Sequence, residues 1–313
     1  MRTPSSRRAL LAAASAAVVA VVAGPVACAA PAGSAAPARA GRVVIISLDG
    51  LRPDAIDKAP APALQALIKK GAFCPKAETI RPSVTLPSHT SMLTGLDYKR
   101  HGVTWNDYKP EKGFIELPTV FSAAKAAGRA TAMFYAKIKF YHFARPGLLD
   151  FMVGDTPETG KAKGAEENSA AGLARAFAAA WPAKDYGVTF VHLREPDAAG
   201  HASGWMGPEY LKAVTEADRG VGAIVETIEK SGGFAKTALI VSADHGGSGK
   251  SHGEDKPENT TIPWICVGPG VKPGLTIARV VRTYDTAATA LAFIGVAPPE
   301  GIDGKAVPEV MGE

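Results

Sequence analysis

Apolar, β-branched runs alternate with amphipathic stretches along most of the chain. The runs are continuous rather than interleaved with polar residues, which is typical of strands covered on both faces. The expected strands are Val43–Leu48, Thr131–Tyr135, Val188–Leu193, Leu239–Ser242 and Pro263–Val267. The expected helices are Ala61–Lys70, Val120–Ala127, Ala170–Trp181, Glu209–Lys230 and Tyr284–Ile294. This alternation predicts an α/β fold, a three-layer α/β/α sandwich with a mostly parallel central sheet.

Aspartates follow three of these strands. Asp49 comes directly after VVIISL, Asp197 follows VTFVHLREP, and Asp244 follows ALIVSA. In open α/β sheets, sites form at the carboxyl ends of the strands. We therefore expect the three side chains to belong to one site at this edge of the sheet.

A polar turn, RPSVTLPSHTSMLTG, runs from Arg81 to Gly95 after the strand-like run Lys76–Ile80, and it opens a short helix. Thr85 stands at the start of that helix, where unpaired amides and the helix dipole favour negative charge. We expect Thr85 to be a nucleophile. A threonine hydroxyl is weak in this role unless a base or a metal takes its proton, so the chain must supply one or the other.

The spacing of acids and histidines suggests metal ligands. Asp197 and His201 stand four residues apart, so one helical turn would point both at one ion. Asp244 and His245 precede two glycines, and His252 lies seven residues beyond His245 in a glycine-rich loop. Taken singly, each pattern also fits an ordinary surface turn or strand-end turn. Taken together, the set is far more specific than its parts.

In this order, the residues resemble the alkaline phosphatase superfamily and, within it, the type I phosphodiesterase/nucleotide pyrophosphatase family. The resemblance implies an alkaline phosphatase-like domain that binds two divalent ions. It assigns one ion to Asp49, Thr85, Asp244 and His245, and the other to Asp197, His201 and His252. It also implies that Asn106, in RHGVTWN, donates an amide hydrogen bond to a phosphoryl oxygen. Histidine and carboxylate ligands without a thiolate favour zinc.

Other polar and aromatic residues near these motifs have open roles. Lys137 and Lys139, in FYAKIKF, resemble the lysine segment with which sulfatases contact their anion, and a solvated pair fits equally well. We place Lys137 among the catalytic residues. His89 and His101 are expected to hold loops, because the ligand sets are already complete. The neighbouring aromatic residues could line a pocket for an aryl or nucleoside group: Phe134, Tyr135, Phe140 and Tyr141.

The expected activity is phosphoric ester hydrolysis through a phosphothreonine at Thr85. Sulfatases carry a cysteine or serine at this position for oxidation to formylglycine, which threonine cannot undergo. A phosphorus ester is therefore favoured over a sulfate ester, and the resemblance of the TLPSH turn to the family favours a small-molecule phosphodiester or nucleotide-type substrate. The alternatives are an alkaline phosphomonoesterase or a phosphonate hydrolase, then a sulfatase, and, outside the enzymes, an envelope protein that binds without catalysis. The last would be favoured by a missing ligand, and the sequence contains all seven.

The first forty residues have the layout of an export signal, with arginines, an apolar run from Ala9 to Gly24, and small residues up to Ala40. We expect residues 1–40 to be this signal and a short linker, and residues 41–313 to be one catalytic domain. The pair Arg7-Arg8 also fits a twin-arginine signal. The protein is then periplasmic or extracellular, with lipid anchoring at Cys28 as a lesser alternative. The apolar run is short for a membrane span, and none is expected in the mature chain.

Charge and cysteine content exclude several classes. The leader holds four arginines and no acid, so 31 basic residues face 30 acidic ones in the rest of the chain. This balance predicts no nucleic-acid-binding surface. Only Cys74 and Cys266 remain after the leader, which excludes a disulfide framework and a cysteine metal site but leaves a single disulfide open. The sequence does not indicate an oligomeric state.

Overall fold

The computed structural model describes residues 39–158 and 166–312. These residues form one eight-stranded sheet in the order β4-β3-β5-β1-β6-β7-β2-β8. The strands are β1 (Arg42–Leu48), β2 (Ala72–Glu78), β3 (Ala130–Tyr135), β4 (Phe151–Val153), β5 (Tyr186–Leu193), β6 (Thr237–Ser242), β7 (Thr261–Val267) and β8 (Leu275–Thr276). Only β7 runs against its two neighbours among them, so the sheet is mostly parallel, as predicted.

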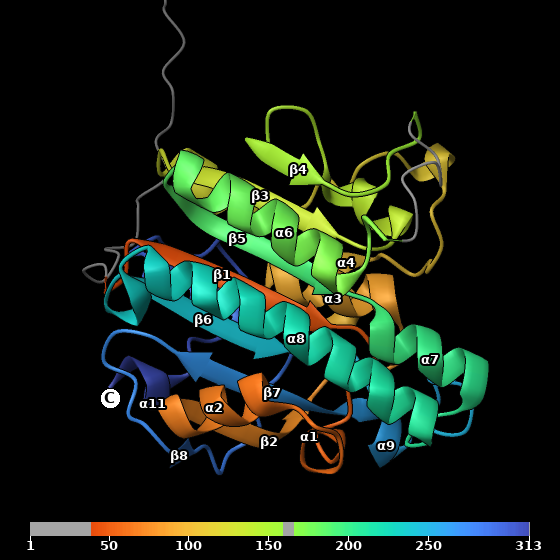
Figure 1. Ribbon diagram of the computed structural model, residues 1–313. Coiled ribbons are helices and arrows are strands. Elements are labelled where there is room, and N and C mark those ends of the chain that lie inside the picture. The colour runs from red at the N-terminus through yellow and green to blue at the C-terminus, as the bar shows by residue number, and fades with distance from the viewer. Residues whose placement is uncertain (1–38, 159–165, 313) are drawn as a thin grey trace, which may run out of the picture. The chain divides into compact units, whose positions relative to one another are not determined.

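Helices cover both faces of the sheet (Figure 1). The α-helices are α1 (Ala55–Lys58), α2 (Pro62–Lys70), α3 (Thr85–Thr94), α4 (Tyr98–His101), α5 (Val120–Ala126), α6 (Ala170–Ala180), α7 (Glu195–Ser203), α8 (Pro208–Lys230), α9 (Pro257–Thr260), α10 (Asp285–Phe293) and α11 (Pro308–Met311). Short 3-10 helices are η1 (Pro110–Lys112), η2 (Ile138–Phe143), η4 (Trp181–Ala183) and η5 (Gly233–Ala235). Helices α2, α6 and α8 pack on one face, and α3, α5 and α10 pack on the other. The predicted three-layer sandwich is confirmed.

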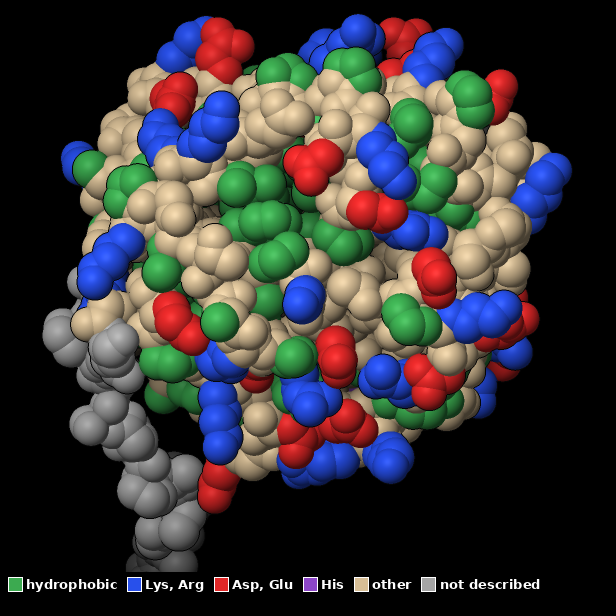
Figure 2. All heavy atoms as spheres, turned by 90° about the horizontal axis from the view of Figure 1, so that it is seen from below, with side chains coloured by type: hydrophobic (Ala, Val, Ile, Leu, Met, Phe, Trp, Pro, Cys, Tyr) green, Lys and Arg blue, Asp and Glu red, His purple; other side chains and the backbone are tan. Residues whose placement is uncertain are grey.

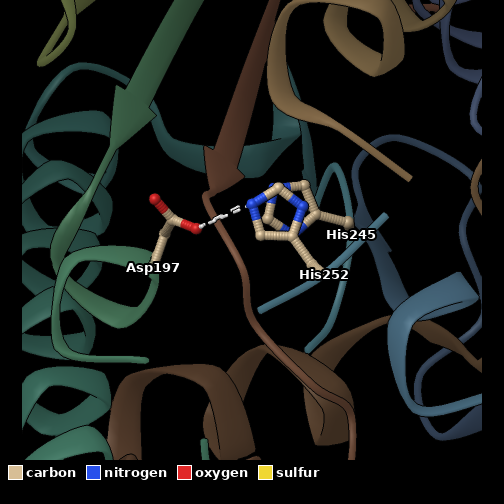
Figure 3. A group of neighbouring side chains, drawn as sticks. All are labelled: Asp197, His245 and His252. Carbon is tan, nitrogen blue, oxygen red and sulfur yellow. Dashed lines mark ion pairs between the residues drawn. The ribbon is translucent and has the colours of Figure 1, made fainter. Parts of the chain in front are cut away.

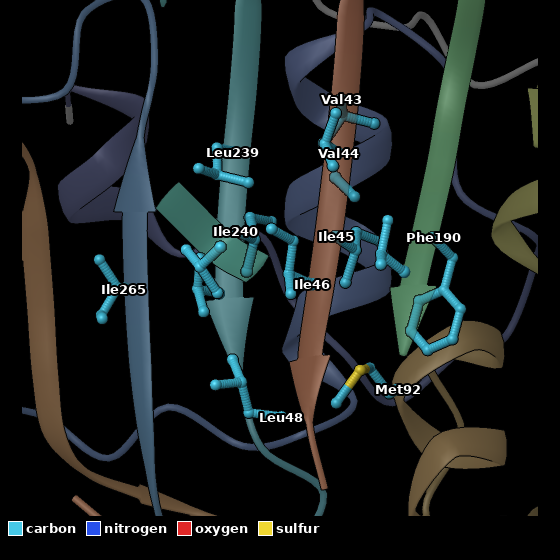
Figure 4. Packing of buried hydrophobic residues seen from close by; sticks show 14 of the residues in the cluster. Val43, Val44, Ile45, Ile46, Leu48, Met92, Phe190, Leu239, Ile240 and Ile265 are labelled. Carbon is cyan, nitrogen blue, oxygen red and sulfur yellow. The ribbon is translucent and has the colours of Figure 1, made fainter. Parts of the chain in front are cut away.

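The central strand β1 explains why the sheet needs both layers. Val43, Val44, Ile45, Ile46 and Leu48 are all 0% exposed, so side chains on both faces of the strand are buried (Figure 4). β-branched side chains favour the extended backbone, and burying each one contributes about 1.5–3 kcal/mol. The core therefore fixes the strand whose end carries Asp49.

The expected strand boundaries differ from the structure mainly around β2. The strand-like run Lys76–Ile80 is only the end of a strand that begins at Ala72, and the antiparallel β7 pairs with it. The last two residues before the predicted boundary at residue 41 pack against the domain. Arg39 and Ala40 both donate their backbone N–H to Phe293 O, and Ala40 is buried. The rest of the predicted export signal, including Cys28, lies outside the described residues.

Surface and cysteine features bear on the partners. The face seen from below in Figure 1 carries Lys and Arg interspersed with Asp and Glu around a central hydrophobic area (Figure 2). This face does not present the single-sign field that a polyanion needs.

Cys74 and Cys266 are both buried and free, so they do not form the disulfide that the sequence left open. In the described part of the chain, no helix combines the length and apolarity that crossing a membrane requires.

Candidate active site

Three strand ends bring the predicted aspartates together. Asp49 follows β1 and Asp244 follows β6, while Asp197 lies in the first turn of α7, directly after β5. Strands β5 and β6 both pair with β1 in parallel register, so their carboxyl ends meet at one edge. Backbone contacts fix the loops there, since Asp197 N donates to Asp49 O at 2.9 Å and Gly50 N donates to Asp244 Oδ1 at 3.1 Å.

Asp49, Asp244 and His245 form what we call the inner group. One ligand atom from each lies within 4.8 Å of the others, and all three side chains are 0% exposed. Asp49 Oδ1 and Asp244 Oδ2 are buried without a hydrogen-bond partner. His245 Nδ1 lies 2.8 Å from Gly246 O, and a carbonyl can only accept, so Nδ1 carries the proton and Nε2 offers its lone pair.

Asp197, His201 and His252 form the outer group. Asp197 Oδ1 lies 3.3 Å from His201 Nε2 and 3.6 Å from His252 Nε2. Figure 3 shows Asp197 facing the rings of His245 and His252, which stack with centroids 3.7 Å apart. One ligand atom from each of Asp197, His245 and His252 also lies within 4.8 Å of the others, so His245 lies between the two groups.

The outer histidines are held in one tautomer by backbone carbonyls. His201 Nδ1 lies 3.0 Å from Lys250 O, and His252 Nδ1 lies 2.7 Å from Ser83 O. Both Nδ1 atoms therefore donate, and the two Nε2 atoms face each other at 3.1 Å with lone pairs that repel unless a proton or cation lies nearby. Ser83 also accepts a bond from Gly253 N through its hydroxyl at 3.1 Å, so this one residue holds the loop of His252 twice.

The electrostatics of the site fit divalent cations. Burial and the nearby Asp49 raise the pKa of Asp244 well above its ordinary value, and the opposing effect of Lys137 is smaller. Burial lowers the pKa of His245 to about 4, which keeps its Nε2 unprotonated at neutral pH. Asp197 Oδ1 is a third buried carboxylate oxygen without a partner. Three such oxygens beside imidazole lone pairs are the donors that zinc prefers.

Thr85 is the first residue of α3 and is 1% exposed. Its Oγ1 lies 3.4 Å from His245 Nε2, which places the predicted nucleophile against the inner group. No side chain of the α3 N-terminus caps the helix; instead, Asn106 Oδ1 accepts from Leu86 N at 2.8 Å. That bond leaves the Asn106 amide N–H atoms available, and the Thr85 N–H has no hydrogen-bond partner among the described residues. Both can face an anion at this helix end.

Lys137 contacts the aspartates of both groups. Its Nζ lies 2.6 Å from Asp49 Oδ2 and 2.5 Å from Asp197 Oδ2. Burial opposes ionisation of Asp49, but Lys137 and His192 hold the pKa of its carboxyl well below the ordinary value. Two of the three ammonium hydrogens are thus engaged by carboxylates. Lys139 has no ion pair in the described part of the chain, and burial together with Lys137 lowers its pKa.

His192 is a site residue that the sequence-based reasoning missed. It lies on β5, where Ala136 N donates to its Nδ1 at 3.3 Å, so its Nε2 carries the proton and donates to Asp49 Oδ2 at 2.8 Å. It thereby orients an inner carboxylate without offering a free lone pair. The available signal was a histidine in the otherwise apolar run VTFVHL, one residue before the strand ends.

The two histidines expected to hold loops are both buried. His89 Nδ1 donates to Thr85 O, and its Nε2 contacts Ser47 Oγ, each at 2.8 Å. His101 Nδ1 accepts from Val103 N at 3.0 Å. His89 therefore links α3 to β1 directly behind Thr85.

The expected aromatic pocket is wrong for three of its four residues. Phe134, Tyr135 and Phe140 are at most 1% exposed and pack in the core. Their rings pack against other buried aromatic rings and offer no surface to a substrate. Only Tyr141 is half-buried, and its ring lies 5.6 Å from that of Phe114 and 6.2 Å from that of Tyr108.

Known proteins share both sequence and fold with this chain. GPI ethanolamine phosphate transferase 1 of Emericella nidulans is 26% identical over 77% of the chain, which spans 28% of the transferase. Bis(5'-adenosyl)-triphosphatase enpp4 of Xenopus laevis is 25% identical over 73% of the chain, which spans 51% of that protein. The chain thus covers about a quarter to a half of these relatives.

Two solved structures show the same fold. Murine ectonucleotide pyrophosphatase/phosphodiesterase 5 superposes with a TM-score of 0.71 at 14% identity, covering 87% of this chain and 98% of that one. Phosphonate monoester hydrolase from Silicibacter pomeroyi superposes with a TM-score of 0.66 at 18% identity, covering 87% and 76%. Residues 43–260, more than half of the sequence, match the family described as type I phosphodiesterase/nucleotide pyrophosphatase. The chain therefore belongs to the type I phosphodiesterase/nucleotide pyrophosphatase family.

Proposed function

We propose that this protein is an exported phosphoester hydrolase that uses two divalent metal ions, with zinc favoured, and forms a phosphothreonine at Thr85. The observation that carries the proposal is the position of the Thr85 hydroxyl, 3.4 Å from His245 Nε2 at the start of α3. Membership of a phosphodiesterase family supports phosphoester chemistry. The unpartnered oxygens of the three aspartates support metal binding.

Each group of side chains would hold one ion. Asp49, Asp244, His245 and the Thr85 hydroxyl would hold the first, and Asp197, His201 and His252 would hold the second. When bound, the ions supply Lewis acidity that favours the ionised Thr85 hydroxyl and offsets charge on the phosphoryl group. The residues themselves position the reacting atoms.

The phosphoryl oxygens would be bound by the Asn106 amide and the Thr85 N–H. Asn106 is held by its bond from Leu86 N, so its remaining donor has little freedom. Donors fixed before the reaction stabilise developing charge without reorganisation. His89 takes no part in the chemistry, but its hydrogen bond to Thr85 O fixes the α3 backbone.

The reaction then takes two displacements. The Thr85 hydroxyl releases its proton to solvent, and its Oγ1 forms a bond to phosphorus while the bond from phosphorus to the ester oxygen on the opposite side breaks. That oxygen takes a proton from solvent and leaves as the alcohol. Water next attacks the phosphothreonine, the Thr85 O–P bond breaks, and the hydroxyl recovers a proton as the phosphate product departs. The two displacements together consume one water and return Thr85 to its free hydroxyl.

We assign phosphodiesters as the preferred substrates. A monoester is close to a dianion, and enzymes that prefer it usually add a cation beyond the metals. Lys137 already has two carboxylate partners. The neutral donors Asn106 and Thr85 N–H suit a monoanionic diester, and Tyr141 with Phe114 and Tyr108 offers aromatic surface for an ester arm.

The decisive test uses the purified chain without its leader. Chromogenic phosphodiesters, phosphomonoesters, phosphonate esters and sulfate esters are assayed with added zinc, for wild type and Thr85→Ala. We expect diester hydrolysis that falls by several orders of magnitude in the variant while the metals stay bound. Rapid quenching with labelled substrate should trap phosphate on Thr85. Label on Ser83 or Ser88 would instead reassign the nucleophile, and no turnover of any ester would reject the enzyme.

Substrate class is tested by the ratio of catalytic efficiencies for bis-aryl and mono-aryl phosphate at mildly alkaline pH. Wild type should favour the diester, and Lys139→Ala should change the ratio little. A monoester preference that collapses in Lys137→Ala or Lys139→Ala would establish the phosphomonoesterase instead.

One second candidate has a specific observation behind it. The matched GPI ethanolamine phosphate transferases indicate that an alcohol, rather than water, could accept the phosphoryl group from Thr85. Product analysis with a primary alcohol present distinguishes the two. A transferase forms the new ester in preference to free phosphate product, whereas a hydrolase does not.

A further inference from the structure

Trp205 joins the segments that carry the candidate ligands. It lies two residues beyond the end of α7 and is 7% exposed. Its indole Nε1 donates to Gly50 O at 2.9 Å, and its backbone N donates to Gly249 O at 2.8 Å. Through its side chain and its backbone, this one residue therefore connects the end of α7, the loop after Asp49 and the loop that leads to His252.

The indole ring also contacts both outer histidines. The ring centroids of Trp205 and His201 lie 5.2 Å apart at an interplanar angle of 81°. Those of Trp205 and His252 lie 5.9 Å apart at 68°. Edge-to-face contacts of this kind restrict rotation of each imidazole about its side-chain bonds. Since His252 also stacks on His245, its ring is confined by both neighbours.

Two glycines of the ligand motifs make room for this indole. A Cβ atom at Gly247 would lie 2.1 Å from Trp205 Cε2, and one at Gly200 would lie 2.6 Å from Cδ2. Contacts this short require the large, buried ring to move. The lack of a side chain at Gly200 and Gly247, close to His201 and His245, thus leaves the space that the Trp205 ring fills.

We propose that Trp205 is a positioning residue that holds the rings of His201 and His252 in the orientation that binds the outer ion. This inference rests on the proposed function, because it assumes that the outer group binds metal. The indole acts through the histidines and touches neither substrate nor reacting atoms. Its ring contacts among the candidate ligands are with the outer histidines, whereas its hydrogen bond reaches the backbone at Gly50 O and no inner side chain.

The test measures metal binding to Trp205→Phe, Trp205→Leu and wild type. Zinc per chain is determined by elemental analysis across a series of buffered free zinc concentrations. Affinity at one of two sites should fall by about 10- to 100-fold, as for other residues that orient metal-ligating histidines. The other site should keep its affinity. Adding the second ion should also change tryptophan emission in wild type, and this signal should vanish in Trp205→Phe.

Trp264→Phe is the matched control. Trp264 is also buried, on β7, and donates to Thr286 Oγ1 away from the site. We expect it to lower thermal stability without changing either zinc affinity. If Trp205→Phe behaves in the same way, Trp205 is only a core residue and the inference is wrong. If wild type binds fewer than two ions, the proposed function fails and the inference fails with it.

A double-variant cycle adds a steric test. Gly247→Ala should weaken the outer site by displacing the indole, and the same substitution in the Trp205→Leu background should have little further effect. Additive losses would show that Gly247 acts independently of Trp205. That result would contradict the steric role assigned to this glycine.

Discussion

The inner and outer groups differ in what holds them. Asp49 and Asp244 follow central strands of the sheet, and both are 0% exposed. His201 lies on the short helix α7 with 46% of its side chain exposed, and His252 lies in a loop with 8% exposed. The inner group is thus positioned by the sheet and the outer group by contacts between a helix and a loop.

This difference teaches that the two halves of one centre need not be equally stable. Strands in the core open only with the whole domain, whereas loops and short helices open locally at lower free energy. Each outer histidine has one hydrogen bond to a backbone carbonyl, from His201 to Lys250 O and from His252 to Ser83 O. We therefore expect a tightly held inner ion and an outer ion that exchanges more readily.

The largest expected effect comes from the inner group. Asp244→Ala should lower turnover by about a thousandfold or more, because it removes a charged ligand from the ion beside Thr85. Zinc content should fall together with activity, measured on the same preparation. Near-normal turnover in this variant would count against the whole site. Asp255→Ala is a suitable control, because Asp255 pairs with Arg81 at an exposed position.

Removing the cation that bridges the groups should have the next largest effect. Lys137→Met leaves two buried carboxylates without their ammonium, so chelator-treated protein should lose about 3 kcal/mol of unfolding free energy. Added zinc should reduce the difference, because the ions then compensate the same charges. Denaturant titration with and without zinc measures both.

Lys125→Met provides the comparison for Lys137. Lys125 pairs with Asp150 at 3.0 Å near the surface, where such pairs contribute at most about 1 kcal/mol. Equal losses of unfolding free energy in the two variants would mean that Lys137 stabilises the protein no more than a surface ion pair does.

The outer group should show a smaller and more selective response. His201→Ala should reduce the affinity for one ion by about 10- to 100-fold while the other ion is retained. Dialysis against a weak chelator should likewise remove one ion before the second. Simultaneous loss of both ions would break the distinction between the groups.

Lowering the pH should have the smallest effect, and it should release the two ions at different pH values. The Asp197 carboxylate, 3.3 Å from His201 Nε2, raises the pKa of His201, whereas burial lowers the pKa of His245 to about 4. As pH falls, His201 takes up a proton first, and the proton competes with its ion. The inner ligand Asp244 has a raised pKa because of burial and the charge of Asp49, and a bound inner ion would offset that charge, so the outer ion should dissociate at a higher pH than the inner one. Zinc per chain after dialysis over a series of falling pH values checks the order.

Much of the fold was predictable because its signals are local. Continuous apolar runs such as Val43–Leu48 mark buried strands, and the aspartates that follow them mark the sheet edge. The reversed direction of β7 was harder to predict. Parallel neighbouring strands need a crossover connection, which is usually a helix. The segment between β6 and β7 holds only the four-residue helix α9. The residue pattern of β7 itself does not indicate in which direction the strand runs.

The site was predictable only where its members share a motif. Asp197 with His201 and Asp244 with His245 lie close in sequence, the start of a helix indicated Thr85, and resemblance supplied Asn106. His192 and Trp205 contact the site through residues more than a hundred positions away, Asp49 and Gly50. Lys137 faces the aspartates because β3 lies beside β5, an adjacency that sequence spacing does not contain.

Ser83 gives the two halves of the chemistry a common support. It precedes Thr85 by two residues, and it holds His252 through its carbonyl and the next residue through its hydroxyl. Anything that shifts this turn when a phosphoryl group binds also shifts an outer ligand. By reciprocity, the factor by which substrate changes zinc affinity equals the factor by which zinc changes substrate affinity. The free zinc concentration around the protein would then set its substrate affinity as well as its rate.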